Sequence, residues 1–261
     1  MAPLEEVNVQ TLLLDCDGVL ADTEAFGHLP AFNDAFEELG LGIHWSLNEY
    51  AELVKIGGGK ERILHYLHSN PVKINGYDLD SLTRELHSIK TKKYIDLIDS
   101  GCIPGRPGIR RLVDEAKAEG WTVAVASTSA VKSVQAVIDA VLSPGSIDAV
   151  FAGDMVKAKK PAPDIYLMAM ERVGAEPRST IVIEDSATGA AAAHNAGLSH
   201  LVTHSAFSAE EEFPFASLIV SDLGELEEPP EIRGGLDSDV TLESGMVTVK
   251  TLERLLDGHS S

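Results

Sequence analysis

Two carboxylates one residue apart follow a short apolar run near the start of the chain. In the segment TLLLDCDGVLADT (residues 11–23), Asp15 and Asp17 come directly after four residues that are typical of a buried strand. Side chains at positions i and i+2 of a strand point to the same face, so the two negative charges repel each other and bring little structural gain. The segment therefore predicts that a cation or a reacting group lies between them.

The charge of the chain restricts its partners. Its 261 residues carry a formal net charge of −20, and a field of that sign repels phosphate backbones, so we expect no nucleic-acid partner. An anionic small-molecule substrate would require cations gathered at one place. No apolar run reaches the ~18 residues that span a bilayer, and residues 1–10 lack the apolar stretch of a signal peptide. We therefore expect no membrane partner.

The two cysteines, Cys16 and Cys102, form no C-x-x-C motif. A zinc site and a disulfide framework are therefore not expected, and a reducing compartment fits. Cys16 lies between two carboxylates whose charges disfavour a thiolate. We interpret Cys16 as a small strand residue and not as a nucleophile.

Short β-rich runs recur along the chain, and helix patterns separate most of them. The runs are apolar almost throughout, as strands buried on both faces of a parallel sheet are. Alternating strands and helices predict a doubly wound, Rossmann-like α/β sheet. The expected strands are residues 11–15, 122–127, 149–153, 180–185, 200–204 and 217–221, and the clearest helix patterns between them start near residues 109, 131 and 163.

Residues 23–100 interrupt this alternation, because their patterns are helical and no strong strand run occurs there. We predict an α/β core formed by residues 1–22 and 101–228 and an inserted, small all-helical cap domain at 23–100. The acidic segment LGELEEPPEI (223–232) is typical of a linker. In the tail, residues 229–261, we expect a short strand and a helix in SGMVTVKTLERLLDG that pack on the core.

Polar residues follow several of the expected strands. Ser127-Thr128-Ser129 follows the second, Glu184-Asp185-Ser186 the fourth, and Lys159-Lys160-Pro161 precedes the fourth. Ligands of open α/β sheets bind beyond the carboxyl ends of the strands, so these groups should meet Asp15 and Asp17 in one crevice. Taken alone, each has a plainer explanation as a helix cap, a turn or a surface lysine. Their joint order favours a site.

Four segments in this order resemble the haloacid-dehalogenase-like phosphohydrolase superfamily: DCDGVLADT, VAVASTSA, KAKKPAPDIY and IVIEDSATGAAAA. The resemblance spans roughly residues 11–222 and implies an Asp nucleophile that forms an aspartyl-phosphate. By this resemblance Asp15 is the nucleophile and Asp17 the general acid and base. Lys160 neutralises the nucleophile and the phosphate, Ser127 hydrogen-bonds the phosphate, and the Thr128 amide assists it.

Carboxylate attack on a phosphate dianion requires a cation, and Mg²⁺ fits because it is hard and takes oxygen ligands. The ligands that the resemblance implies are the Asp15 carboxylate, the Asp17 carbonyl oxygen and the Asp185 carboxylate. Glu184 is a further ligand or lies just behind them. The halide-releasing branch needs neither the metal nor an acid two residues after the nucleophile, so Asp17 favours phosphoryl transfer.

The insert contains a glycine-rich loop, KIGGGKERI (55–63). A nucleotide P-loop is excluded, because position 54 is Val where that motif needs Gly, and position 61 is Glu where it needs Ser or Thr. Gly58 and Gly59 instead suit a loop whose backbone approaches a ligand closely. Lys60 and Arg62 could bind a second anionic group, and Lys90 and Arg106 are further candidates.

Three segments resemble the CbbY-type branch of the superfamily: DTEAFGHLPAFNDAF, WSLNEYAELVKIGGGKER and GDMVKAKKPAPDIY. That branch is associated with the hydrolysis of sugar phosphates, notably the Rubisco inhibitor xylulose-1,5-bisphosphate. By that resemblance the sugar or its distal phosphate is contacted by Glu24, His28, Tyr50, Lys60 and Arg106. Gly27 makes the spacing from Asp22 to His28 one residue longer than in many bacterial relatives. The resemblance implies a location in the plastid stroma of a photosynthetic eukaryote, with the transit peptide absent from this chain, or otherwise in the cytoplasm. We expect a monomer.

Three alternatives remain open. A β-phosphoglucomutase-like sugar phosphomutase would share every core motif, because it also passes through an aspartyl-phosphate. A broad-range sugar-phosphate phosphatase would differ only in the insert. A non-enzymatic scaffold on this fold would be expected to carry a damaged motif, and all the expected core residues are intact here.

Overall fold

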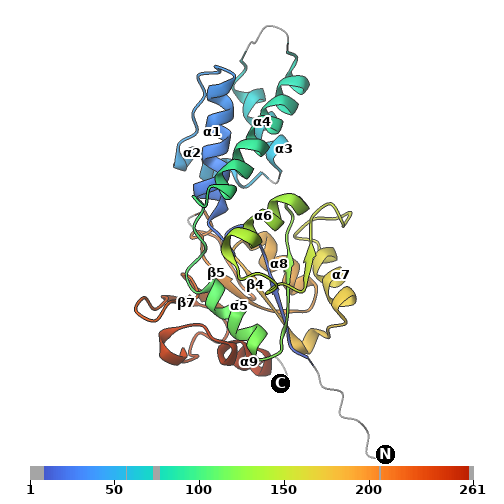
Figure 1. Cartoon of the computed structure of the whole chain (residues 1–261), viewed down its shortest axis with the longest axis vertical. Coiled ribbons are helices and arrows are strands. Elements are labelled where there is room, and N and C mark those ends of the chain that lie inside the picture. The colour runs from blue at the N-terminus through green and yellow to red at the C-terminus, as the bar shows by residue number, and fades with distance from the viewer. Residues whose placement is uncertain (1–8, 57, 73–76, 206, 259–261) are drawn as a thin grey trace, which may run out of the picture. The chain divides into compact units, whose positions relative to one another are not determined.

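The computed structural model describes residues 9–56, 58–72, 77–205 and 207–258. The chain forms two compact units (Figure 1). The first, called the core unit below, comprises Met1–Ala21 and Gly105–Ser261, and the second, the helical unit, comprises Asp22–Pro104. In the part of the chain that the structure describes, no helix is both long and apolar enough to cross a bilayer.

In its described residues, the core unit contains one sheet of seven strands in the order β3-β2-β1-β4-β5-β6-β7. The first six strands pair in parallel, and the last pairs antiparallel at the edge. This order confirms the doubly wound parallel sheet. The strands are β1 (Thr11–Leu14), β2 (Thr122–Ala126), β3 (Ala149–Phe151), β4 (Thr180–Glu184), β5 (Ser199–Thr203), β6 (Leu218–Val220) and β7 (Ile232–Gly234).

The central strands are buried on both faces, which explains why their sequences are apolar without alternation. All residues of β1, β4 and β5 are buried. Helices α7 (Asp164–Val173) and α8 (Ala187–Asn195) pack against one face of the sheet in a single apolar cluster. Helices α5 (Ile109–Ala118) and α9 (Val249–Gly258) contact each other and lie against β2 and β4, and α6 (Val131–Val141) lies against β3.

The parallel register brings the carboxyl ends of the central strands to one edge. Leu14, the last residue of β1, pairs with Val125 of β2 and with Ile183 of β4. The residues that follow these positions therefore lie side by side. Asp15 continues β1 by donating its backbone N–H to the Ile183 carbonyl oxygen at 3.0 Å.

In its described residues, the helical unit consists of η1 (Glu24–His28), α1 (Leu29–Glu38), α2 (Leu47–Leu53), α3 (Gly59–Ser69) and α4 (Leu79–Asp99). Capping boxes start α2 at Ser46 and α4 at Asp78. Its core is aromatic: the Phe32 ring centroid lies 4.9 Å from that of Trp45.

A π-helical turn lies near the start of the helical unit. Residues Glu24–His28 form this turn, which continues directly into α1. One additional residue in a helix produces such a bulge, because the hydrogen bonds then span five residues instead of four. Gly27 is required there, since a Cβ atom would lie 2.6 Å from Ile103 Cδ1 and 2.8 Å from Tyr94 Cε2.

The tail differs in detail from the sequence expectation. The short strand expected in SGMVTVKTLERLLDG is absent: residues 243–245 form a 3₁₀ turn, and the strand β7 lies earlier, within what was expected to be a linker and the start of the tail. The local pattern MVTV favoured a strand, but Val247 and Val249 are buried beside a helix start instead. The helix α9 was expected, and its apolar residues are buried.

We predict that α9 contributes directly to core stability. Leu252 is fully buried, so Leu252→Ala should lower the free energy of unfolding by about 2–5 kcal/mol. Urea denaturation followed by circular dichroism measures this. Leu226, which is 75% exposed, provides the matched control, and Leu226→Ala should change stability by no more than about 0.5 kcal/mol. Equal, small effects of the two substitutions would contradict the packing of α9.

Candidate active site

Lys160 lies at the centre of the charged groups beyond β1 and β4. Its Nζ atom donates to Asp15 Oδ1 at 2.6 Å, to Glu184 Oε1 at 2.6 Å and to the Ala126 carbonyl oxygen at 2.9 Å. The ammonium group has three protons, so these acceptors account for all of them. Lys160 thereby joins the ends of β1, β2 and β4.

Glu184 is fully buried and its carboxylate is shared. Oε1 accepts from Lys160 and also from the hydroxyl of Tyr166 in α7, and Oε2 accepts from the Asp185 backbone N–H at 3.3 Å. The carboxylate fits beneath α8 because residue 189 is glycine, where a Cβ atom would lie 2.0 Å from Oε2. Glu184 thus holds Lys160 in place and is less available to a metal ion than its neighbours.

Three carboxylates could hold a metal ion here. Ligand oxygens of Asp15, Glu184 and Asp185 lie within 4.8 Å of one another. Gly18, with φ +83°, lies so close to Asp185 that a Cβ atom would be 2.0 Å from Oδ2, and this packing fixes Asp185 toward the cluster. An all-oxygen, anionic set is the kind that Mg²⁺ takes, so the residues present fit that ion.

The pKa shifts of the carboxylates in this cluster also favour a bound cation. Burial raises the pKa of Asp15 to about 7, with Lys160 opposing the rise and Glu184 and Asp17 adding to it. Burial and then the charges of Asp15 and Glu184 raise the pKa of Asp185 well above its ordinary value. One lysine therefore does not balance these carboxylates, and a divalent cation would relieve the remaining repulsion. Burial, assisted by Asp17 and Asp15, raises the pKa of the Cys16 thiol, which disfavours a thiolate nucleophile.

The segment after β2 supplies hydroxyl groups. Ser127 is buried and its Oγ accepts from the Ser129 backbone N–H at 3.1 Å, while Thr128 is exposed. Ser129 Oγ donates to Asp17 Oδ2 at 2.5 Å. The structure therefore places the end of β2 against the second acid of the first motif.

In the helical unit, three of the expected substrate-binding residues contact one another. Tyr50 donates its hydroxyl to Glu24 Oε2 at 2.5 Å, and Arg62 donates to the Tyr50 oxygen. Arg62 Nη1 lies 3.7 Å from Glu24 Oε2, and Nη2 is 3.3 Å from the carbonyl oxygens of Val54 and Ile56. Arg62 is 6% exposed, so its guanidinium group links these residues in the interior of the helical unit.

His28 and Lys90 form a second pair. Lys90 Nζ lies 2.9 Å from His28 Nδ1, and it stands over the rings of Phe32 and Tyr94 at 4.8 and 4.9 Å from their centroids. Burial and then the charges of Lys90, Arg62 and His87 lower the pKa of His28 well below its ordinary value. His28 is therefore neutral at pH 7.

The glycine-rich loop leads into α3. Gly58 has φ +98° and stands at the N-cap, where a Cβ atom would lie 2.1 Å from Glu61 Oε2, so the position requires glycine. Gly59 is the first residue of the helix and Lys60 is exposed in its first turn. Gly57, in the same loop, lies outside the described residues.

Arg106 belongs to the core unit and binds backbone there. Its Nη2 donates to the carbonyl oxygens of His204 at 2.5 Å and Ser221 at 2.7 Å, which follow β5 and β6. The structure thus places Arg106 beyond the carboxyl ends of those strands, where it fixes their separation.

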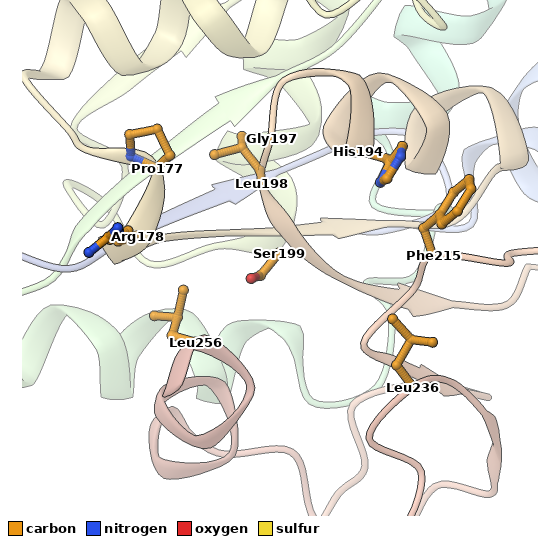
Figure 2. A pocket seen from close by; sticks show the side chains of 9 residues that line it. All are labelled: Pro177, Arg178, His194, Gly197, Leu198, Ser199, Phe215, Leu236 and Leu256. Carbon is orange, nitrogen blue, oxygen red and sulfur yellow. The ribbon is translucent and has the colours of Figure 1, made fainter. Parts of the chain in front are cut away.

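A cavity of about 320 Å³ lies at the opposite end of the strands (Figure 2). Ser199, the first residue of β5, and Arg178, just before β4, line it, and the His194 ring stacks on Phe215 with centroids 3.8 Å apart. None of its lining residues is a carboxylate, and its position at the amino ends separates it from Asp15. The chemistry therefore belongs to the other edge. The lining comprises Pro177, Arg178, His194, Gly197, Leu198, Ser199, Phe215, Leu236 and Leu256.

The sequence analysis assigned no role to two residues of the site, Tyr166 and Ser129. Tyr166 falls in the apolar stripe of α7, where an aromatic residue indicates core packing. Ser129 is part of the hydroxyl-rich run after β2, but nothing in that run distinguishes it from its neighbours. Both contact a carboxylate distant in the sequence, by 18 and 112 residues.

We predict that removing the Lys160 charge destabilises the metal-free protein. Lys160→Met should lower the free energy of unfolding by about 3–5 kcal/mol, because it leaves buried carboxylates without a cation. The loss should be smaller in the double variant Lys160→Met/Glu184→Gln. Urea denaturation in EDTA measures both, with exposed Lys159→Met as the control. If the double variant is as unstable as the single one, the Lys160–Glu184 pair does not carry the effect.

Comparisons with known proteins identify the family of the chain. The family model described as haloacid dehalogenase-like hydrolase matches residues 9–197. A CBBY-like protein of Arabidopsis thaliana is 43% identical over 228 residues, which cover 85% of this chain and 70% of that protein. Protein CbbY of Cupriavidus necator is 40% identical over 225 residues, covering 85% and 88%.

A solved structure is also similar. It is a mutant of CbbY from Rhodobacter sphaeroides in complex with xylulose-1,5-bisphosphate, with a TM-score of 0.73, 35% identity, and coverage of 88% of this chain and 98% of that one. The family match, the relatives and the carboxylate–lysine site together lead to one conclusion. The chain belongs to the haloacid-dehalogenase-like hydrolases, and it is an enzyme of their sugar-phosphate phosphatase type.

Proposed function

We propose that the chain is a Mg²⁺-dependent phosphatase that converts xylulose-1,5-bisphosphate to xylulose-5-phosphate and so removes an inhibitor of Rubisco. The observation that carries the phosphatase chemistry is the buried contact of Asp15 with Lys160 beside Asp185. The CbbY relatives, one of which was crystallised with that bisphosphate, support the choice of substrate.

In the first step, Asp15 attacks phosphorus and forms an aspartyl-phosphate, while Asp17 gives a proton to the leaving sugar oxygen. Lys160 reduces the repulsion between Asp15 and the incoming phosphate. The Ser127 hydroxyl and the Thr128 amide hold phosphate oxygens. Asp15, the Asp17 carbonyl oxygen and Asp185 would hold Mg²⁺, with Glu184 behind them, and the ion when bound stabilises the charge on the transferring group.

In the second step, water attacks the aspartyl-phosphate and Asp17 takes its proton. Inorganic phosphate leaves, and the Asp15 carboxylate is restored. The residues assigned to both steps come from one chain, so the proposal needs no second copy. An enzyme that removes a Rubisco inhibitor must occupy the same compartment as Rubisco. That compartment is the plastid stroma in a photosynthetic eukaryote and the cytoplasm in a bacterium.

We further propose that the helical unit recognises the sugar and its second phosphate. Glu24, His28 and Tyr50 offer hydrogen bonds to hydroxyl groups, while Gly58, Gly59 and Lys60 offer a backbone approach and a cation at the start of α3. Arg62 and Lys90 are buried, so their charges favour an anion through the field of the unit. Arg106 is bound to backbone carbonyls in the core unit, and we propose that it acts on substrate only through that scaffold.

The decisive experiment is phosphate release from a panel of sugar phosphates, with Mg²⁺ and with EDTA. The panel contains xylulose-1,5-bisphosphate, ribulose-1,5-bisphosphate, fructose-1,6-bisphosphate, β-glucose-1-phosphate and phosphoglycolate. We expect a large preference in kcat/KM for xylulose-1,5-bisphosphate, loss of turnover in EDTA, and loss of turnover in Asp15→Asn with the fold retained. Isomerised glucose phosphate without phosphate release would indicate a mutase, and a flat profile a broad-range phosphatase.

Lys60 is predicted to distinguish bisphosphates from monophosphates. Lys60→Ala should raise KM for xylulose-1,5-bisphosphate by about tenfold, the equivalent of one charge-assisted hydrogen bond. The KM for a monophosphate should change much less. Lys55, exposed in the same unit and paired with Glu52, supplies the control variant Lys55→Ala. Equal effects of Lys60→Ala on both substrates would exclude a contact with the second phosphate.

A further inference from the structure

Ser129, the third residue after β2, makes a short contact with Asp17, the second acid of the first motif. Its Oγ donates to Asp17 Oδ2 at 2.5 Å, and both side chains are half-buried. The two residues are 112 positions apart, and both belong to the core unit. This contact joins the segment after β2, which faces the phosphate in the proposed mechanism, to the group that moves protons.

The backbone of Ser129 is fixed from two sides. Its N–H donates to Ser127 Oγ at 3.1 Å, and its carbonyl oxygen accepts from the Gly153 N–H at 3.2 Å. Gly153 permits this approach, because a Cβ atom there would lie 2.2 Å from the Thr128 carbonyl oxygen. The hydroxyl of Ser129 is therefore delivered to Asp17 by a segment with little freedom to move.

A serine hydroxyl suits a partner that changes its protonation state. It can donate to the carboxylate form and accept from the carboxylic acid form, since it has one proton and two lone pairs. A hydrogen bond to one carboxyl oxygen also fixes the plane of the group. We propose that Ser129 is a positioning residue that holds the Asp17 carboxyl group in the orientation that both proton transfers need; this rests on the proposed phosphatase function.

The proton balance shows where Ser129 acts. In the first step an Asp15 oxygen bonds to phosphorus, the bond from phosphorus to the sugar oxygen breaks, and that oxygen takes the Asp17 proton. In the second step a water oxygen bonds to phosphorus, the bond from phosphorus to the Asp15 oxygen breaks, and the water proton returns to Asp17. Ser129 reverses the direction of its hydrogen bond between the steps and gains or loses no proton overall.

If Ser129 acts through Asp17, its removal should affect substrates with poor leaving groups more than substrates with good ones. A purely structural or phosphate-binding role would not produce this difference. An alkyl phosphate has a poor leaving group that needs the proton of Asp17. The nitrophenolate ion of 4-nitrophenyl phosphate leaves without one. A residue that acts through Asp17 should therefore matter for the first step with the alkyl ester and not with the aryl ester. A residue that binds the phosphoryl group should matter equally for both.

The test compares Ser129→Ala, Ser129→Thr and the wild-type protein in Mg²⁺, with xylulose-1,5-bisphosphate as the alkyl ester and 4-nitrophenyl phosphate as the aryl ester. For Ser129→Ala we expect kcat/KM to fall about 10- to 100-fold with the alkyl ester, a part of the roughly 10²- to 10⁴-fold that general acid catalysis supplies, and to change little with the aryl ester. With the aryl ester this variant should also show a burst of nitrophenol, because hydrolysis of the aspartyl-phosphate still needs Asp17. Ser129→Thr, which keeps the hydroxyl, should restore the alkyl activity.

The matched control is Ser143→Ala, which removes another serine-to-aspartate contact, from Ser143 Oγ to Asp114 Oδ2 at 3.1 Å, outside the site. It should leave both activities unchanged. Equal losses of Ser129→Ala on the two esters, or no loss on either, would overturn the positioning role while the wild-type phosphatase activity stands. Absence of wild-type turnover on both esters would overturn the proposed function together with this inference.

Discussion

The contact of one buried lysine with two buried carboxylates is the constraint on which the rest of the site depends. Lys160 satisfies Asp15 and Glu184 together, and it does so where β1, β2 and β4 end. Buried charges persist only when they are paired and hydrogen-bonded. Tyr166 above Glu184 and glycine at position 189 beside it complete that arrangement. The local charge remains negative, which is the condition under which a divalent cation binds.

An acidic protein that acts on an anionic substrate must gather its cations, and the chain does so in two different ways. In the core unit the Lys160 ammonium group is held by the carboxylates of Asp15 and Glu184. In the helical unit Arg62 and Lys90 are buried among aromatic rings, with Arg62 5.0 Å from the Tyr50 centroid. Cation–π contacts stabilise both charges, and Arg62 is in addition paired with Glu24 at 3.7 Å, so the positive field of this unit is partly compensated.

Glycines fix the geometry of the site at positions where any side chain would collide. Gly18 makes room for Asp185, Gly189 for Glu184, and Gly153 for the turn that carries Ser129. The π-turn at Glu24–His28 is a further local departure from regular geometry. It holds one residue more than a regular helical turn, and α1 continues regularly after it. Such irregular turns are frequent at functional sites, where backbone placement matters more than helix regularity.

The sequence by itself determined the sheet, its parallel character and the set of charged groups at its edge. It could do so because doubly buried strands are apolar throughout and because the ends of parallel strands must meet at one edge. Only the tertiary structure decided which of these groups touch. The contact of Ser129 with Asp17 and the binding of Arg106 to the His204 carbonyl oxygen join residues 112 and 98 positions apart in the chain. The contact of Tyr166 with Glu184 and the pairing of β7 with β6 join nearer segments, but both depend on where whole elements pack. Such pairings follow from the packing of whole elements, and no local residue pattern encodes them.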